Sequence, residues 1–304
     1  MATLASIVQR VRNTVYGAFP TEAPFVTTLA ASHNISATTV TVLEEDNWAA
    51  QDILENQETN EEMLVLSVTT DGSDVLTVIR AWEGSTAAAS VGADDVLVKN
   101  PRFRYSQISQ AITETLASLE SWGIYVHGNT QITRADPAWF YELAVTDVVE
   151  PMGVLRAYEV EVNASIPRSL PFRYQHNLGT NPAEYSVGAG VTMQDWGATL
   201  NTEEVELIYA KKIAATTDLL TRQEELVVLG AVARLLGATI VPATHDPGAR
   251  SDRTVQPGQT GRDWGNFQGR FINMARQEAG LLAVERQKFL AEVPKYARAR
   301  RWSG

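Results

Sequence analysis

The sequence predicts an α+β fold: a helical bundle with an N-terminal small β unit and an inserted antiparallel β-sandwich. Three observations lead to this fold class. Apolar residues recur at helical spacing near both ends of the chain, apolar and polar residues alternate in two separate stretches between them, and prolines punctuate the second stretch. With 304 residues, of which 44% are hydrophobic, the chain is long enough to bury a sizeable core. The expected domains are residues 1–104, residues 105–121 with 214–304 as the helical core with a long C-terminal helix and basic tail, and the inserted sandwich 122–213.

The N-terminal part begins with a helix and continues as strands. Apolar residues from Leu4 to Val15 share one helical face, which predicts a docked helix over about residues 3–16 that Gly17 ends. From about Thr38 to Asn100 the pattern alternates between apolar and polar residues, and Asp71-Gly72 predicts the turn of a β-hairpin.

The stretch "RAWEGSTAAASVGADDV" (80–96) joins a strand predicted over Val75–Trp82 to another over Val96–Asn100. No Lys follows Gly84 as a phosphate-binding P-loop requires, and Ser85 lacks the flanking glycines of a nucleophile elbow. We therefore interpret the stretch as a structural hairpin connection without chemistry of its own. Its structural motif residues are Arg80, Glu83, Gly84 and Thr86.

A helix and then a β-rich segment occupy the middle of the chain. An apolar stripe from Ile108 to Leu119 predicts a helix over about residues 106–121. The segments Arg156–Val162 and Glu204–Ile213 alternate cleanly, which indicates half-buried strands. Because these strands lie among many prolines and aromatics, we expect a small antiparallel sandwich inserted between helices.

The C-terminal part is predicted to be helical. Thr221 with Glu224 matches a capping box, so a helix should begin there, and Gly237 is expected to end it. Residues 242–260 have the composition of a loop, and a long helix should run from about Arg262 to Val293. Three glycines at a spacing of four predict a close helix contact or a loose helix start: Gly261, Gly265 and Gly269.

Charge is unevenly distributed along the chain, whose net charge is −11. Residues 250–304 carry 11 Lys and Arg against 5 Asp and Glu, which leaves 14 basic and 31 acidic residues for the remainder. The basic end is expected to dock on an acidic partner, such as a neighbouring copy, although a solvated helix face would give the same pattern. The acidic remainder argues against a protein that grips duplex DNA.

The sequence predicts no active site, cofactor or metal, and hence no enzyme. Cysteine is absent, which excludes disulfides and thiolate chemistry. No two of the four histidines have the spacing of metal ligands, and neighbouring carboxylates in a strand point to opposite faces. There is no apolar run long enough to span a membrane. The histidines are His33, His127, His176 and His245.

The stretch "RAWEGSTAAASVGADDVLVKNPRF" (80–103) is similar to a loop of tailed-phage virion proteins, Arg-Gly-x-x-Gly-Thr-Thr-Ala-Ala-x-His-x-x-Gly, which a strand and an Asn-Pro-Arg-Phe-like exit follow. It departs from that loop at Ala81, where the motif has Gly, and at Ser90, where it has His. The order of elements also resembles the head-to-tail adaptor (connector) proteins of tailed bacteriophages. The resembling elements include "QISQAITETLASL", "VELIYAKKI" and an Arg-rich final helix.

This resemblance implies a structural part of the virion neck at the head-tail junction, assembled in the host cytoplasm. It implies a homo-oligomeric ring, a dodecamer, that binds the portal protein and holds a downstream tail or nozzle protein. During genome ejection DNA would pass through the lumen without specific binding, and no membrane is involved. The residues expected at the portal or subunit interface are Lys295, Tyr296, Arg298, Arg300, Arg301 and Trp302.

Two other classes of protein stay open at this point. One is another phage tail or receptor-binding protein whose β-sandwich binds carbohydrate, because aromatic residues can stack on sugars. The other is a hydrolase, which loss of turnover on mutating one Asp or Glu would reveal. The aromatics available to a sugar are Trp139, Phe140, Tyr141 and Trp196.

Overall fold

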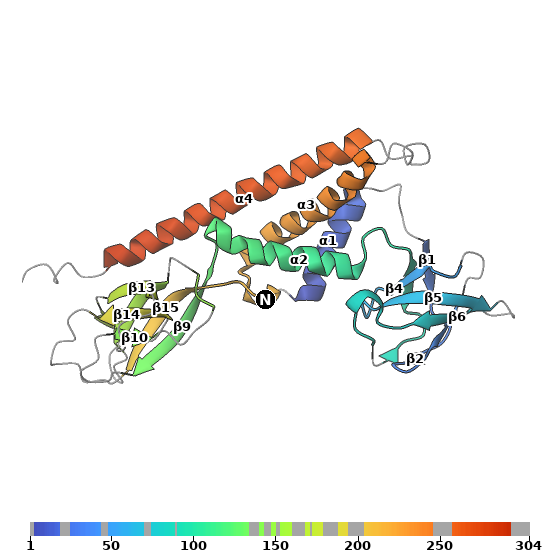
Figure 1. Cartoon of the computed structure of the whole chain (residues 1–304), viewed down its shortest axis with the longest axis horizontal. Helices are drawn as coiled ribbons and strands as arrows, with labels where there is room; N and C mark the ends of the chain where they lie inside the picture. Colours follow the sequence, from blue (N-terminus) through green and yellow to red (C-terminus); the bar gives the residue numbers. More distant parts are fainter. Residues whose placement is uncertain are drawn as a thin grey trace, which may run out of the picture. The chain divides into compact units, whose positions relative to one another are not determined.

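The chain has an α+β fold with antiparallel sheets, as the sequence predicts (Figure 1). In this computed structural model, four α-helices lie within the described residues: α1 (Leu4–Ala18), α2 (Tyr105–Leu119), α3 (Thr221–His245) and α4 (Pro257–Glu292). The structure describes residues 3–18, 25–43, 48–69, 74–88, 90–133, 140–142, 147–149, 153–159, 168–170, 172–178, 188–193, 204–245 and 257–292.

The chain divides into two compact units, and each unit takes a part of α2, α3 and α4. The barrel unit consists of Ala2–Thr115 and Glu224–Phe271. The two-sheet unit consists of Leu116–Gln223 and Ile272–Gly304, with Met1. The three-domain division expected from the sequence stays a prediction.

The N-terminal strands form a sheet that closes on itself. In the sheet order β1-β8-β4-β5-β6-β3, the end strands β1 and β3 are joined by a bridge between Leu29 and Val42. There the backbone N–H of Ala30 donates to the Thr41 carbonyl at 2.9 Å. The result is a small six-stranded barrel, a form that leaves its end strands paired. Its strands are β1 (Phe25–Thr28), β3 (Thr39–Val42), β4 (Ile53–Asn56), β5 (Glu62–Thr69), β6 (Asp74–Ile79) and β8 (Val96–Lys99).

The barrel interior is filled with aliphatic side chains and one tryptophan. A short separate ladder, β2 (His33–Asn34) with β7 (Ser90–Val91), contributes Val91 to this core. Because side chains alternate along a strand, each strand gives every second residue to the interior. The buried cluster consists of Leu29, Val40, Val42, Trp48, Leu54, Met63, Val65, Leu76, Val78, Val91 and Leu97.

The connection after β6 differs from the sequence prediction. The predicted hairpin β5–β6 is confirmed, but β6 ends at Ile79, where Trp82 was expected. The 80–96 stretch is not a hairpin connection, because β6 pairs with β5 and β3 whereas β8 pairs with β1 and β4. Ala81 and Glu83 have φ values of 53° and 50°, and such left-handed residues interrupt a strand. A 3₁₀-helix, Trp82–Gly84, follows.

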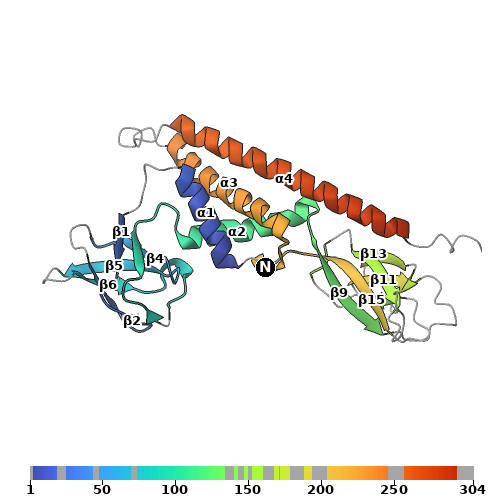
Figure 2. The same ribbon diagram turned by 180° about the vertical axis from the view of Figure 1, so that it is seen from behind.

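The apolar helical stripes predicted from the sequence are confirmed. The α1 residues Ile7, Val11 and Val15 are fully buried, and so are Ile108 and Ile112 of α2. In the barrel unit α1 lies beside α3 in both views (Figures 1 and 2).

The ends of α3 and α4 correct the sequence prediction. Helix α3 continues through Gly237 to His245, and α4 begins at Pro257 rather than near Arg262. The loop expected over 242–260 is therefore wrong at both ends, and 246–256 lie outside the described residues. A Cβ at Gly237 would stand 3.1 Å from the Trp264 ring nitrogen, so this glycine makes room for a neighbouring helix instead of ending its own.

At these helices one further local prediction is wrong, and one of two alternatives for another is excluded. The side chain that reaches back to the start of α3 is Gln223, whose Oε1 accepts the Leu220 N–H at 3.1 Å. Glu224, the expected capping residue, pairs with Arg10 at 2.9 Å. For the glycine spacing, a close helix contact is excluded at Gly265 and Gly269, because nothing lies within 4 Å of a Cβ at either position. The alternative of a loose helix start stays a prediction.

The two-sheet unit contains two antiparallel sheets, ordered β12-β11-β15-β9 and β10-β14-β13 (Figure 2). One hydrophobic cluster takes residues from both, including Ala157 of β11 and Val191 of β14. The half-buried strand predicted within Glu204–Ile213 is confirmed, because Val205, Leu207 and Tyr209 of β15 are buried. The strands are β9 (Val126–Thr133), β10 (Phe140–Glu142), β11 (Val154–Glu159), β12 (Arg168–Ser169), β13 (Phe172–Leu178), β14 (Gly188–Met193) and β15 (Glu204–Lys211).

Candidate functional site

The 80–88 loop is organised around one buried carboxylate, that of Glu61, which is 0% exposed. Arg80 donates to both of its oxygens, from Nε at 2.5 Å and from Nη2 at 2.6 Å. The backbone N–H groups of Ala81 and Ala88 donate to the same carboxylate at 3.3 and 3.0 Å. A bidentate pair with two further donors is a strong, directional arrangement. Glu61 therefore fixes both ends of the loop.

The other motif residues have contacts of a structural kind. Glu83 forms an ion pair of 2.6 Å with Arg104, which leads into α2. Gly84 has a φ of 82°, in the region that favours glycine. Thr86 is exposed. Ser85, the residue that a catalytic loop would use, instead accepts the backbone N–H of Glu62 at 3.0 Å.

Two carboxylates from the barrel bind the N-terminus of α2. Glu55 accepts the backbone N–H of Tyr105 at 2.8 Å, and Glu62 accepts that of Ser106 at 2.6 Å. The two glutamates are paired neighbours on β4 and β5, so their side chains lie on the same face of the barrel. They satisfy N–H groups that a helix start leaves without partners, and their charge suits the positive end of its dipole.

Helix α1 contributes a cation to the same place, because Arg12 pairs with Glu55. Burial raises the pKa of Glu55, and Glu62 acts in the same direction, whereas Arg12 and the Tyr105 N–H oppose them. The pKa of Tyr16 is also raised, by burial and then by Glu55. The barrel, α1 and α2 therefore meet at a buried group of charges, here called the joint, which consists of Arg12, Glu55 and Glu62. Its stability depends on the pairing of these charges with one another and with the N–H groups of α2.

Replacing Glu55 by glutamine is expected to change how stability depends on pH. Because the pKa of Glu55 is higher in the folded than in the unfolded chain, its contribution is complete below the unfolded pKa and is lost as pH rises through the folded one. The free energy of unfolding of wild type minus that of Glu55→Gln should therefore fall with rising pH. Urea titrations from about pH 4 to about pH 8 measure it. Exposed Glu83→Gln is the control, and a constant difference for Glu55→Gln would contradict the assignment.

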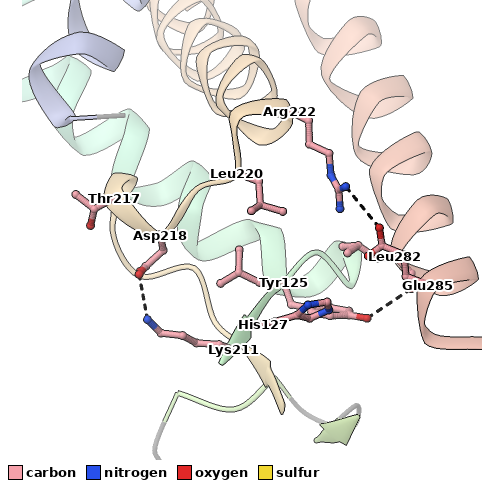
Figure 3. A pocket seen from close by; sticks show the side chains of 10 residues that line it. Tyr125, His127, Lys211, Thr217, Asp218, Leu220, Arg222, Leu282 and Glu285 are labelled. Atoms are coloured by element: carbon pink, nitrogen blue, oxygen red, sulfur yellow. Dashed lines mark hydrogen bonds and ion pairs between the residues drawn. The ribbon is translucent and has the colours of Figure 1, made fainter. Parts of the chain in front are cut away.

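A cavity of about 310 Å³ opens in the two-sheet unit where β9, β15, α3 and α4 meet (Figure 3). At one side Lys211 pairs with Asp218 at 3.0 Å. At the other, Arg222 pairs with Glu285 at 3.5 Å. The Tyr125 hydroxyl donates to the backbone carbonyl of Leu282 at 3.5 Å. Each cation at the cavity wall thus has a carboxylate partner from the same wall.

Several polar groups at the cavity wall hold α3 and α4 together. Glu278, which is 7% exposed, accepts Arg222 Nε at 2.9 Å and Gln223 Nε2 at 3.0 Å, and so ties the start of α3 to α4. Burial lowers the pKa of His127, with Glu285 opposing and Arg222 assisting, so the imidazole is neutral near pH 7. Among the residues that the structure describes, no three His, Asp or Glu are placed to hold a metal ion.

The structure describes only some of the residues singled out in the sequence. The six tail residues expected at an interface, Lys295 to Trp302, lie outside the described residues, and so do Trp139 and Trp196. Phe140 and Tyr141 lie in β10.

The histidines are dispersed. His33 accepts the Thr41 N–H at 3.1 Å, His127 borders the cavity, His176 lies in β13 and His245 ends α3. The predicted separation of neighbouring carboxylates holds for Glu61, which faces Arg80, and Glu62, which faces α2.

Sequence reasoning missed the Glu55–Glu62–Arg12 joint. A signal for it exists, since Arg12 interrupts the apolar stripe of α1 beside Val11 and must find a buried acceptor.

No protein-family model matches the chain, and no curated protein matches its sequence. Within the described residues, none of the helices has both the length and the apolar character that crossing a membrane requires.

Proposed function

We propose that the chain is a structural protein of a tailed-phage virion, the head-to-tail adaptor of its neck. In this role copies form a homo-oligomeric ring, a dodecamer, beneath the portal protein at the head-tail junction. The ring extends the DNA channel for genome ejection and provides the platform to which the downstream tail or nozzle protein attaches.

One observation carries this proposal: the backbone of the 80–84 turn. The first turn of the phage loop that the sequence resembles has Gly at two positions, which correspond here to Ala81 and Gly84. Both have positive φ, 53° and 82°, a conformation in which glycine is least strained. A left-handed backbone at both motif positions is what glycine favours, and it is present here even at Ala81. This conformation supports the resemblance to the phage loop. The role of the loop is structural, because Arg80 and its neighbours hold Glu61.

The proposal includes a finer architecture than α+β. The helices of the barrel unit form a bundle, which is supported by the close approach that Gly230 allows to Thr115 and Phe271. The two sheets β12-β11-β15-β9 and β10-β14-β13 pack as an inserted sandwich, which is supported by their shared cluster. In the ring this sandwich faces the outside or the downstream tail component.

The charge distribution suits a channel through which DNA slides. Outside residues 250–304, the chain has 31 acidic and 14 basic residues. An acidic wall repels the phosphate backbone, so DNA passes without adhering.

Electron microscopy of the purified protein, alone and with portal rings of the same phage, tests the proposed function. We expect closed rings seen end-on, and co-axial attachment of one ring to each portal. Removing residues 295–304 should abolish attachment, and replacing them with a Gly/Ser segment of equal length controls for chain length. A chain that forms no ring in either sample, or whose rings never bind portals, would rule out the adaptor function.

A further inference from the structure

The C-terminal half of α4 exposes a face with an apolar centre and basic flanks. Leu281 and Val284 are 53% and 50% exposed and lie one helical turn apart. The two exposed charges of the described stretch 273–288 are Arg276 and Lys288, both basic. The name α4 outer face denotes Arg276, Leu281, Val284 and Lys288.

The acidic residues of the same stretch are paired with the start of α3. Glu278 and Glu285 both pair with Arg222, at 2.9 and 3.5 Å. Because both carboxylates are engaged by Arg222, Arg276 and Lys288 leave positive charge on the outer face. Exposed large aliphatic side chains beside such charge are typical of an interaction surface.

The barrel exposes a second apolar surface, on the side of the sheet away from its core. Leu64 of β5 pairs with Ile53 of β4 on one side and with Ile79 of β6 on the other, so the three side chains form a row. Leu66 lies at the β-bulge between Val65 and Ser67 and is 49% exposed, and Ile79 is 41% exposed. The name barrel patch denotes Ile53, Leu64, Leu66 and Ile79.

The barrel that carries this patch is acidic. Residues 25–104 hold 13 Asp and Glu against 4 Lys and Arg. Three of those four cations pair with carboxylates of the same segment: Arg80 with Glu61, Lys99 with Asp52 and Arg104 with Glu83. The remaining carboxylates give the barrel a negative field that complements the α4 outer face.

We infer that the α4 outer face of one copy of this chain binds the barrel patch of a second copy. Aliphatic side chains meet at the centre, and Arg276 and Lys288 lie against the acidic barrel around it. Because the two surfaces differ, each copy uses one to bind a neighbour and keeps the other for the next, which builds a ring when the rotation closes. The inference specifies the subunit contact of the ring and rests in that respect on the proposed function.

Two variants of the full chain test this contact by sedimentation velocity. The α4 variant carries Leu281→Glu and Val284→Glu, and the barrel variant carries Leu66→Glu and Ile79→Glu. Each alone should lose self-association by at least about tenfold, because a carboxylate is placed in an apolar contact. Mixed together they should form a heterodimer and nothing larger, since each copy retains one of the two surfaces intact.

Two comparisons serve as controls. Ile35→Glu changes a residue that is 54% exposed and outside the barrel patch, so it should leave assembly unchanged. Assembly of the wild type should weaken with rising salt, and Arg276→Glu with Lys288→Glu should weaken it at low salt. Circular dichroism of every variant verifies the fold, and recovery of the heterodimer shows independently that both variants are folded.

Several outcomes overturn the inference. The inference is wrong if the α4 variant assembles like the wild type. It is also wrong if the mixture of the two variants stays monomeric, or if the wild type is monomeric at every concentration. Imaging separates this inference from the proposed function. Rings that persist in the α4 variant refute the contact and leave the adaptor function standing. Heterodimers of the expected kind together with rings that never bind portals support the contact and refute the adaptor function.

Discussion

Replacing Glu61 by alanine is expected to lower the free energy of unfolding by about 3–5 kcal/mol, which is the usual loss when one partner of a buried ion pair is removed. The side chain of Arg80 is 8% exposed and would stay buried without its counter-charge. The backbone N–H groups of Ala81 and Ala88 would lose their acceptor as well. The barrel should therefore unfold at markedly lower denaturant concentration than in the wild type.

Guanidinium titration followed by circular dichroism measures this loss. Glu83→Ala is the matched control. The Glu83 side chain is 40% exposed, so its ion pair with Arg104 should contribute only about 0–1 kcal/mol to the free energy of unfolding. Replacing both Glu61 and Arg80 by apolar residues should recover part of the stability, because no charge is then left buried. Equal losses in Glu61→Ala and Glu83→Ala would contradict the role assigned to the Glu61 carboxylate.

Replacing Gly230 by alanine should destabilise the barrel unit, because overpacking a core usually costs about 1–3 kcal/mol. A Cβ there would stand 2.5 Å from Thr115 Cγ2 and 2.9 Å from the Phe271 ring. Neither neighbour can retreat easily, because Thr115 is fully buried and Phe271 is 7% exposed. The usual gain in helix propensity from Gly to Ala, about 1 kcal/mol, offsets part of this cost, so we expect a net loss of up to about 2 kcal/mol.

Gly280→Ala is the matched control, because it makes the same change in a helix and is expected to raise stability. Nothing lies within 4 Å of a Cβ at Gly280, so this change should stabilise α4 by up to about 1 kcal/mol. Adding Thr115→Ser to Gly230→Ala should restore part of the loss, because serine lacks the obstructing methyl. Thermal or urea unfolding measures all three. A neutral Gly230→Ala would show that α2, α3 and α4 are not closely packed at this point.

The sequence predicts the helices and the regular strands well because their signal is local. The buried stripe of α1 follows from apolar residues spaced three to four apart, and the inner face of β15 from apolar residues spaced two apart. Both spacings can be recognised within the segment itself, without knowing its partners. The β5–β6 hairpin is equally local, since its strands are joined by one short turn.

Features that depend on distant partners could not be predicted in this way. Closure of the barrel needs Leu29 beside Val42, and no local pattern specifies that bridge. Gly237 matches a helix end by its residue type, and only the arrival of Trp264 explains why the helix continues. Buried glutamates contradict the expectation that charged residues are exposed, which is why Glu55 and Glu62 were missed.

The candidate site was predicted only in part for the same reason. The motif residues Arg80 and Glu83 stand out in the sequence, but their partners Glu61 and Arg104 are about twenty residues away in either direction. The cavity groups come from β9, β15, α3 and α4, so their meeting is a property of the fold rather than of any segment.

The carboxylates that bind the start of α2 also impose an order on how the chain acquires its structure. Glu55 precedes Tyr105 by 50 residues, and Glu62 precedes Ser106 by 44. During synthesis from the N-terminus, the acceptors therefore leave the ribosome well before the donors they serve. The N–H groups of this first turn obtain both acceptors only when β4 and β5 are paired. We therefore expect the turn to become stable after the strands that precede it have paired.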